Sequence, residues 1–170
     1  MKKVKAIRYI CLGGILAAIT VILQSAPVYL PVIGLVLSPL STLPIAMATV
    51  INAYLGIMVL ISSSLILIIV SIQEALILLF ATGLIGLILG GLIHRRGYLA
   101  SILAALVSLM IGLMILTYIV AIPGFRDFTS SLSLFTIILI YFIFSFFYIS
   151  IWAIYIRRFT GRFLYAILKL

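Results

Sequence analysis

Long apolar runs recur from end to end of this chain, and they constrain its fold more than any other feature. A helix needs about 20 apolar residues to cross the hydrocarbon layer of a bilayer, and several runs here have that length. Hydrophobic residues make up 67% of the 170 residues and charged residues only 8%, whereas a soluble domain carries about 25% charged residues. The sequence therefore predicts an integral membrane protein and excludes a large catalytic ectodomain, a disordered chain and a disulfide scaffold.

The breaks between the apolar runs predict six spans in a single transmembrane domain, residues 1–170. Polar or glycine-containing breaks occur at Asn52, at Gln73 and Glu74, and at residues 94–97 and 123–127. The predicted fold class is an all-α integral membrane protein, a bundle of six transmembrane helices. The predicted spans cover residues 7–26, 42–54, 56–72, 74–93, 98–122 and 132–156.

A proline-rich stretch separates the first two predicted spans. It holds four of the five prolines, at positions 27, 31, 39 and 44. Proline lacks the amide donor and disfavours helix in the residue before it. The stretch is nevertheless apolar, and non-helical backbone at membrane depth persists only where it is buried in protein or lines a cavity. We therefore expect residues 27–44 to form a lid-like loop folded over or into the bundle.

The basic residues predict the orientation. With six spans and a cytoplasmic N-terminus, ten of the eleven Lys and Arg residues lie inside, and Arg126 is the exception. This distribution agrees with the positive-inside rule, so the net charge of +9 reports topology rather than nucleic-acid binding. We expect a multi-pass protein of the plasma membrane with both termini cytoplasmic. We also expect the first span to be retained, because residues 23–27 make a poor signal-peptide cleavage site.

Small residues spaced four apart mark faces where helices approach closely in lipid. The first span carries two such pairs, Gly13 with Ala17 and Gly14 with Ala18. This face either packs inside the bundle or docks a helix of a partner protein. Similar spacings in the fourth and fifth spans are more typical of internal packing.

Glu74 is the most informative single residue. A carboxylate next to a membrane span is costly unless it is paired, solvated or protonated, which makes it a candidate for substrate contact. The alternative is an interfacial acid that faces water at a helix start. Its neighbour Gln73, and Gln24 at the end of the first span, are expected on the same outer side.

One face of the sixth predicted span carries a second set of candidates. Tyr141, Ser145 and Tyr148 fall at helical spacing in its outer half. They are suited to stack on and hydrogen-bond a small ring-containing ligand, although core packing explains the same pattern. The predicted substrate-binding residues are thus Glu74, Gln73, Gln24 and these three.

Enzymatic and metal chemistry find no support in the sequence. The chain has one His and one Cys and contains no Walker loop, no HExxH and no Ser-His-Asp set. We expect no catalytic residue, no metal site and no cofactor. Any ATP-driven work must come from a partner.

The assembled features resemble the substrate-binding S component of energy-coupling factor (ECF) transporters. The shared features are six spans in a short chain, the small-residue face of residues 13–18, the Pro-rich first outer loop and the Arg95–Arg96 hinge. A group of uncharacterised multi-span proteins has a similar profile. The resemblance implies uptake of a vitamin-like micronutrient, with a transmembrane coupling subunit and cytoplasmic ATPases as partners. It further implies that Gly13, Gly14, Ala17 and Ala18 dock the coupling subunit.

Two alternatives remain open. Small rod-shape proteins that scaffold cell-wall synthesis have a similar length and build, but their second span usually opens with Pro-Asp, whereas Pro44 here precedes Ile45. A small stand-alone secondary carrier is the other alternative, although the sequence shows no clear inverted repeat. A scaffold predicts no sizeable pocket, and a carrier predicts ionisable groups near the bilayer midplane.

Overall fold

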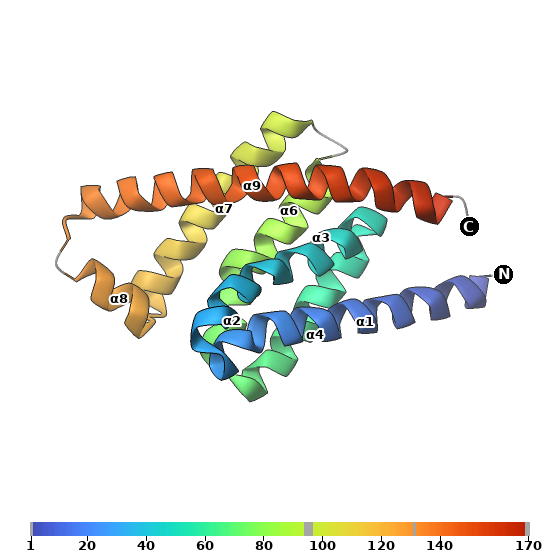
Figure 1. Ribbon diagram of the computed structural model, residues 1–170, viewed down its shortest axis with the longest axis horizontal. Helices are drawn as coiled ribbons and strands as arrows, with labels where there is room; N and C mark the ends of the chain where they lie inside the picture. Colours follow the sequence, from blue (N-terminus) through green and yellow to red (C-terminus); the bar gives the residue numbers. More distant parts are fainter. Residues whose placement is uncertain (1, 94–96, 131, 169–170) are drawn as a thin grey trace.

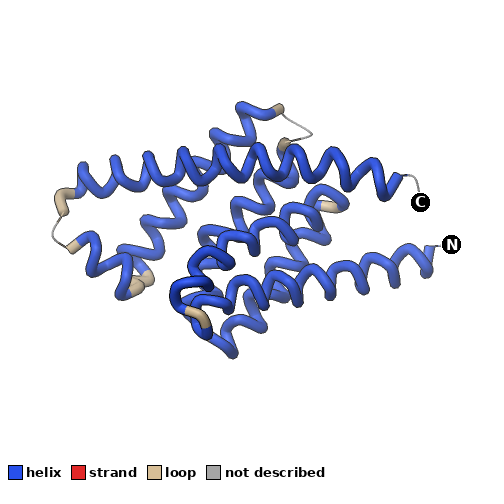
Figure 2. Tube along the Cα trace, in the orientation of Figure 1, coloured by secondary structure: helices blue, strands red, loops and turns tan. Residues whose placement is uncertain are grey.

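The computed structural model describes residues 2–93, 97–130 and 132–168, and within these ranges it is helical with no strand. Figure 2 shows helices throughout, joined by short loops. The elements are α1 (Lys2–Tyr29), α2 (Pro31–Leu37), the 3-10 segment η1 (Ser38–Ser41), α3 (Thr42–Ile51), α4 (Ala53–Val70), α5 (Ile72–Ile77), the π-helical segment η2 (Leu78–Thr82), α6 (Gly83–Leu92), α7 (Tyr98–Met114), the π-helical segment η3 (Ile115–Ile119), α8 (Pro123–Thr129) and α9 (Leu134–Leu168).

These elements combine into six spans in the described part of the chain, as the sequence predicts. Each is long and apolar enough to cross a membrane. The spans are Tyr9–Tyr29, Pro31–Ile51, Ala53–Val70, Ile72–Leu92, Tyr98–Ile119 and Leu134–Arg158. The all-α six-helix fold class is therefore confirmed. The expected hinge at Arg95 and Arg96 lies outside the described residues.

The helices pack as one bundle with both chain ends at the same end of the molecule (Figure 1). The α1 helix packs against α2, α3 and α4, and α3 packs against α4 and α6. The α7 helix joins α6 to α9, and the short α8 lies between α7 and α9 at the end remote from the termini (Figure 1). An even number of spans explains why the two ends meet on one side.

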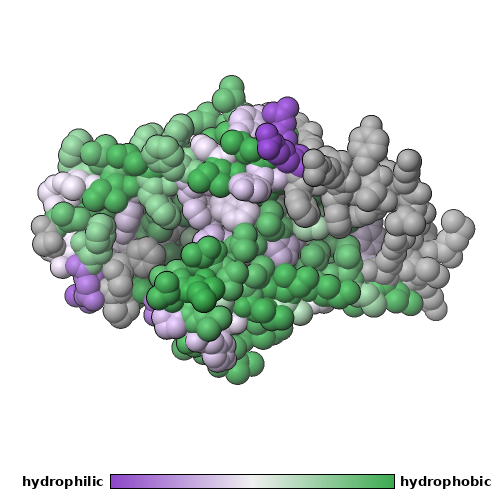
Figure 3. Space-filling view, viewed as in Figure 1, coloured by the Kyte–Doolittle hydropathy of each residue, from purple (hydrophilic) through white to green (hydrophobic). Residues whose placement is uncertain are grey.

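The outer surface of the bundle is apolar. Hydrophobic residues cover most of the face in Figure 3, and hydrophilic residues form only small patches on it. Many large apolar residues are exposed; for example, Ile69 is 87% exposed and Val32 is 80% exposed. A soluble monomer does not carry apolar exposure on this scale, so a lipid bilayer is the environment that the surface requires.

The Pro-rich stretch is helical, and the expectation of a lid-like loop over residues 27–44 was wrong. The α1 helix continues past Pro27 to Tyr29, and only Leu30, at φ −131° and ψ 80°, interrupts the helical path before Pro31 opens α2. Pro39 lies at the start of η1, and Pro44 lies in the first turn of α3. Proline is tolerated in the first turn of a helix because the amide there has no helical partner.

The second span consequently runs from Pro31 to Ile51 instead of 42–54. The bounds of the other five spans differ from the predicted ones by no more than three residues. A chain of short helical pieces satisfies its own backbone at membrane depth, which a loop there does not. The turn at Leu30 is tight, since a Cβ on Gly34 would collide with the backbone of Ala26 and Pro27.

Small residues allow α6 to approach α3. A Cβ built on Gly90 would lie 2.6 Å from the carbonyl oxygen of Ala46, and one on Gly86 would lie 2.8 Å from that of Thr42. Gly112 of α7 similarly meets the backbone oxygen of Phe80. These contacts place the small residues of the fourth and fifth spans inside the bundle, the position that their spacing favours.

We expect Gly90→Ala and Gly14→Ala to change stability in opposite directions. The new methyl group at position 90 would overlap the α3 backbone and should lower the free energy of unfolding by about 1–3 kcal/mol. Position 14 has no neighbour within 4 Å, so the better helix propensity of alanine should raise it by up to about 1 kcal/mol. Unfolding by denaturant in mixed detergent micelles measures both. Equal destabilisation would contradict the close α3–α6 approach.

Candidate functional site

Four buried polar side chains meet between the first, second and fourth spans. The amide nitrogen of Gln24 donates to Glu74 Oε2 at 2.8 Å. The amide oxygen of Gln24 accepts from the hydroxyls of Ser41, at 2.7 Å, and Thr82, at 3.1 Å. All four side chains are at most 8% exposed, and Gln24 and Ser41 are fully buried. We refer to these four residues as the polar cluster.

Irregular local structure brings three of the four members of the polar cluster into place, whereas Gln24 lies in the regular helix α1. Ser71 interrupts the helix between α4 and α5, and its side chain accepts from the backbone amide of Glu74, which fixes the first turn of α5. Thr82 is the last residue of the π-helical segment η2, and Ser41 is the last residue of η1. A 3-10 turn is tighter than an α-helical turn and a π-helical turn is wider, so both change the direction in which the neighbouring side chains point. π-helical turns are often found at functional sites.

Hydrogen bonding fixes the orientation of the Gln24 amide. A carbonyl oxygen accepts two hydrogen bonds, and Ser41 and Thr82 together supply both. The NH2 group must then point at Glu74, where it acts as a donor. A carboxylate that receives an amide donor on one oxygen keeps further acceptor capacity on the other. The polar cluster thus holds Glu74 as an acceptor.

A cavity of about 330 Å³ adjoins Glu74 and Thr82. Its volume is at the lower end of the range for small-molecule sites, and its walls are mostly apolar with a few polar groups, as such sites usually are. The lining residues are Pro27, Leu35, Ser38, Pro39, Gln73, Glu74, Ile77, Ala81, Thr82, Ile85, Leu109, Leu113, Phe144 and Tyr148. They come from the first, second, fourth, fifth and sixth spans.

Tyr148 lines this cavity from the sixth span. Its ring stacks on that of Phe144, with centroids 5.7 Å apart and planes inclined by 27°. The Tyr148 hydroxyl is buried and has no hydrogen-bond partner within the described residues. Tyr148 therefore gives the cavity an aromatic wall.

The predicted substrate-binding residues divide into two groups. Glu74, Gln73 and Tyr148 line the same cavity, and Gln24 is joined to it through Glu74. Tyr141 and Ser145 do not line it. The Tyr141 hydroxyl is 2.6 Å from that of Thr117, and Ser145 is fully buried with an unpartnered hydroxyl. Tyr141 and Ser145 are therefore placed as core residues. Core packing was the alternative interpretation of the helical face that they share with Tyr148.

Ser41 and Thr82 belong to the cluster but were not among the predicted residues. Hydroxyls in apolar helices usually bond their own backbone, as Thr20, Thr49 and Thr117 do here. No local pattern separates Ser41 and Thr82 from these. Ser41 and Thr82 differ from the others because they end the irregular segments η1 and η2. These segments are visible only in the structure.

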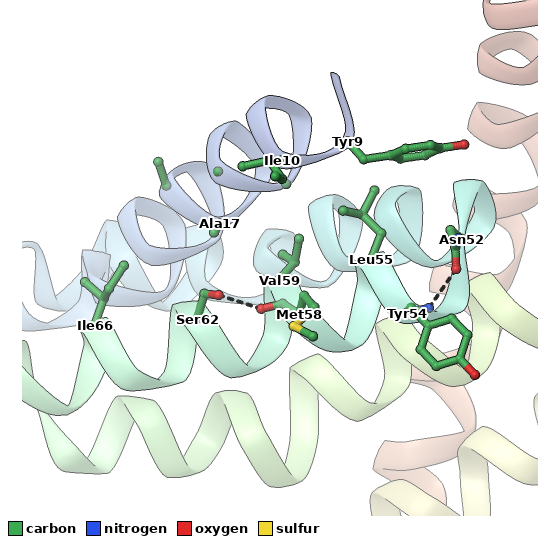
Figure 4. A pocket seen from close by; sticks show the side chains of 13 residues that line it. Tyr9, Ile10, Ala17, Asn52, Tyr54, Leu55, Met58, Val59, Ser62 and Ile66 are labelled. Carbon is green, nitrogen blue, oxygen red and sulfur yellow. Dashed lines mark hydrogen bonds between the residues drawn. The ribbon is translucent and has the colours of Figure 1, made fainter. Parts of the chain in front are cut away.

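The small-residue face of α1 borders a larger groove, of about 650 Å³, between α1 and α4. Figure 4 shows Ile10 and Ala17 of α1 facing Leu55 and Val59 of α4 across it. Ala17 is buried, and its carbonyl accepts from Ser63 at 3.3 Å. Gly14 and Ala18 are exposed on the groove. One half of the predicted docking face therefore packs inside the bundle, and the other half is open.

The two hollows differ in chemistry. The groove is lined almost entirely by apolar side chains, and its Ser62 hydroxyl bonds the backbone oxygen of Met58 in its own helix (Figure 4). The smaller cavity is lined by Glu74 and Thr82 of the polar cluster and by Gln73 and Ser38. Recognition of a small polar molecule needs such groups, so the smaller cavity is the candidate site.

Comparisons with known proteins add no assignment: no family model matches the chain, and neither a curated protein nor a solved structure matches it. Among the described residues there is also no group of three or more His, Cys, Asp or Glu side chains that could hold a metal ion. The geometry of the site alone carries the functional argument.

We expect Gln24→Leu to destabilise the bundle by about 1–3 kcal/mol, because it leaves Glu74, Ser41 and Thr82 without their shared partner. Adding Glu74→Met should recover part of this loss, since the buried carboxylate is then removed too. Denaturant unfolding in micelles compares the single and double variants. Ser62→Ala is the control, as this exposed hydroxyl bonds only its own helix. Strictly additive losses would argue against a coupled cluster.

Proposed function

We propose that the protein is a membrane-embedded substrate-binding subunit for uptake of a small vitamin-like metabolite, energised by partner proteins. The observation that carries this proposal is the cavity whose mostly apolar wall includes Glu74, Gln73 and Thr82. Convergent polar groups in an apolar pocket are the usual form of a small-molecule site. The ECF S-component resemblance agrees with this proposal.

The position of the cavity supports binding from outside the cell. Gln24 lies near the end of α1 remote from the N-terminus, and Glu74 lies in the first turn of α5, at the start of the fourth span. The positive-inside rule assigns the termini of the chain to the cytoplasm of a plasma-membrane protein. The polar cluster then lies in the outer half of the bilayer, where cargo arrives.

Energy for uptake has to come from other subunits, since the sequence contains no nucleotide-binding motif. We assign the groove between α1 and α4 to a transmembrane coupling subunit, which would connect the chain to cytoplasmic ATPases. Gly14 and Ala18 leave room there for close approach of a partner helix. Gly13 and Ala17 belong to the same small-residue face and pack against α4.

The alternatives fit the site less well. A scaffold for cell-wall synthesis needs no pocket, and it leaves the cavity and its buried hydroxyls without a role. A stand-alone carrier is favoured by one observation, the buried Glu74. However, Glu74 begins its span instead of lying at mid-depth, and the chain has no second acidic residue within a span.

Native mass spectrometry of the protein purified in mild detergent from its own host tests the proposal. We expect a stoichiometric small metabolite on the wild-type protein, together with ATPase and coupling subunits. Ala81→Leu fills the cavity wall and should remove the metabolite, whereas Ser150→Ala, which is outside the cavity, should retain it. A protein that carries no metabolite and only cell-wall synthesis partners would reject uptake in favour of the scaffold.

We expect Gly14→Leu with Ala18→Leu to block assembly with a coupling subunit while metabolite binding persists. The two leucines fill the open half of the groove without touching the cavity. Co-purification measures assembly, and mass spectrometry of the same sample measures bound metabolite. Val107→Leu, on the exposed face of α7, is the control. Lost metabolite binding with intact assembly would contradict the assignment of the two surfaces.

A further inference from the structure

Glu74 brings a carboxylate to the cavity wall, and no basic side chain pairs with it in the described part of the chain. The sequence contains one other acidic residue, Asp127, which lies in α8 between the last two spans. The Gln24 amide is the single side-chain donor found for the Glu74 carboxylate among the described residues. Glu74 is buried, and a buried carboxylate is costly to ionise until it is paired. A cation in the cavity would complete the pair.

The hydrogen bonds of the polar cluster hold the Glu74 carboxyl group in place. Ser41 and Thr82 occupy both acceptor positions of the Gln24 oxygen, which turns the amide donor toward Glu74. The Gln24 donor occupies one Glu74 oxygen and leaves the other without a side-chain partner among the described residues. A positively charged donor bonds a carboxyl group more strongly than a neutral one, because it stabilises the ionised form.

The remaining walls favour an organic cation over an inorganic one. Divalent ions take several oxygen or imidazole ligands, and the described residues contain no group of three or more His, Cys, Asp or Glu side chains. Around it the cavity is built from aliphatic side chains and the stacked rings of Phe144 and Tyr148. Aromatic faces attract both apolar groups and ammonium groups.

The volume of the cavity favours a small molecule. At about 330 Å³ it lies at the lower end of the range for small-molecule sites.

We propose that this cavity binds a small organic monocation, with a protonated amine or similar nitrogen donor on Glu74 and an apolar or aromatic body between the aliphatic walls and Tyr148. The inference rests on the proposed function, since it names the chemical class of the cargo. It assigns Glu74 to charge recognition, Gln24 to positioning of Glu74, and the Tyr148 ring to contact with the body of the molecule.

Binding of matched compounds to the full-length protein in mild detergent tests the proposal. The panel consists of small amines with their alcohol and carboxylate counterparts, including 2-phenylethylamine, 2-phenylethanol and phenylacetate. Isothermal titration calorimetry measures affinity, and thermal unfolding confirms that each variant is folded. We expect the amines to bind at least about tenfold more tightly than their counterparts, the effect of one charge-assisted hydrogen bond.

Two isosteric variants separate charge recognition from general loss of charge. Glu74→Gln should weaken amine binding by about tenfold to hundredfold and leave alcohol binding nearly unchanged. Asp127→Asn removes the same charge outside the spans and should leave both unchanged. Equal loss for amines and alcohols in Glu74→Gln would show a structural role and overturn the charge assignment.

The outcomes distinguish this inference from the proposed function. Alcohols or carboxylates that bind as well as amines would overturn the cationic class while leaving substrate binding in place. Stabilisation by sodium chloride in place of the amines would make the site one for an inorganic cation and would also overturn it. If no compound binds the wild type more tightly than Ala81→Leu, both the inference and the proposed function fail.

Discussion

The hydrogen bond from Gln24 to Glu74 is the interaction on which the site depends. It joins the first span to the fourth, and the hydroxyls of Ser41 and Thr82 extend it to the second span. In an apolar interior an unmet polar group is costly, so the four side chains must be satisfied together. This requirement fixes the relative position of three spans and leaves one carboxylate facing the cavity.

Helix irregularities gather around the polar cluster. The 3-10 segment η1 and the π-helical η2 lie in spans that contribute to it, and the interruptions at Leu30 and Ser71 directly precede those spans. Regular helices would satisfy their backbones equally well, but the Thr82 and Ser41 side chains would then point in other directions. The breaks therefore serve to place side chains, while close contacts at Gly86, Gly90 and Gly112 bring the other helices together.

Run length predicts the spans because bilayer thickness sets how many apolar residues a helix needs, and this rule is local. The same local reasoning was wrong for residues 27–44, since a proline in a first helical turn and a proline in a loop look alike in sequence. Glu74 and Gln24 stood out because charge and amides are rare in lipid-facing runs. Ser41 and Thr82 did not, because their neighbours Thr20 and Thr49 bond their own helix with the same kind of hydroxyl.

Infrared difference spectroscopy of wild type against Glu74→Gln, both in an Asp127→Asn background, tests the central interaction most directly. Glu74 is then the sole side-chain carboxyl group, because the chain has only two acidic residues. We expect Gln24→Leu to shift the carboxyl band of Glu74, because the amide hydrogen bond to Oε2 is lost. A Glu74 band that Gln24→Leu leaves in place would contradict the hydrogen bond on which the site depends.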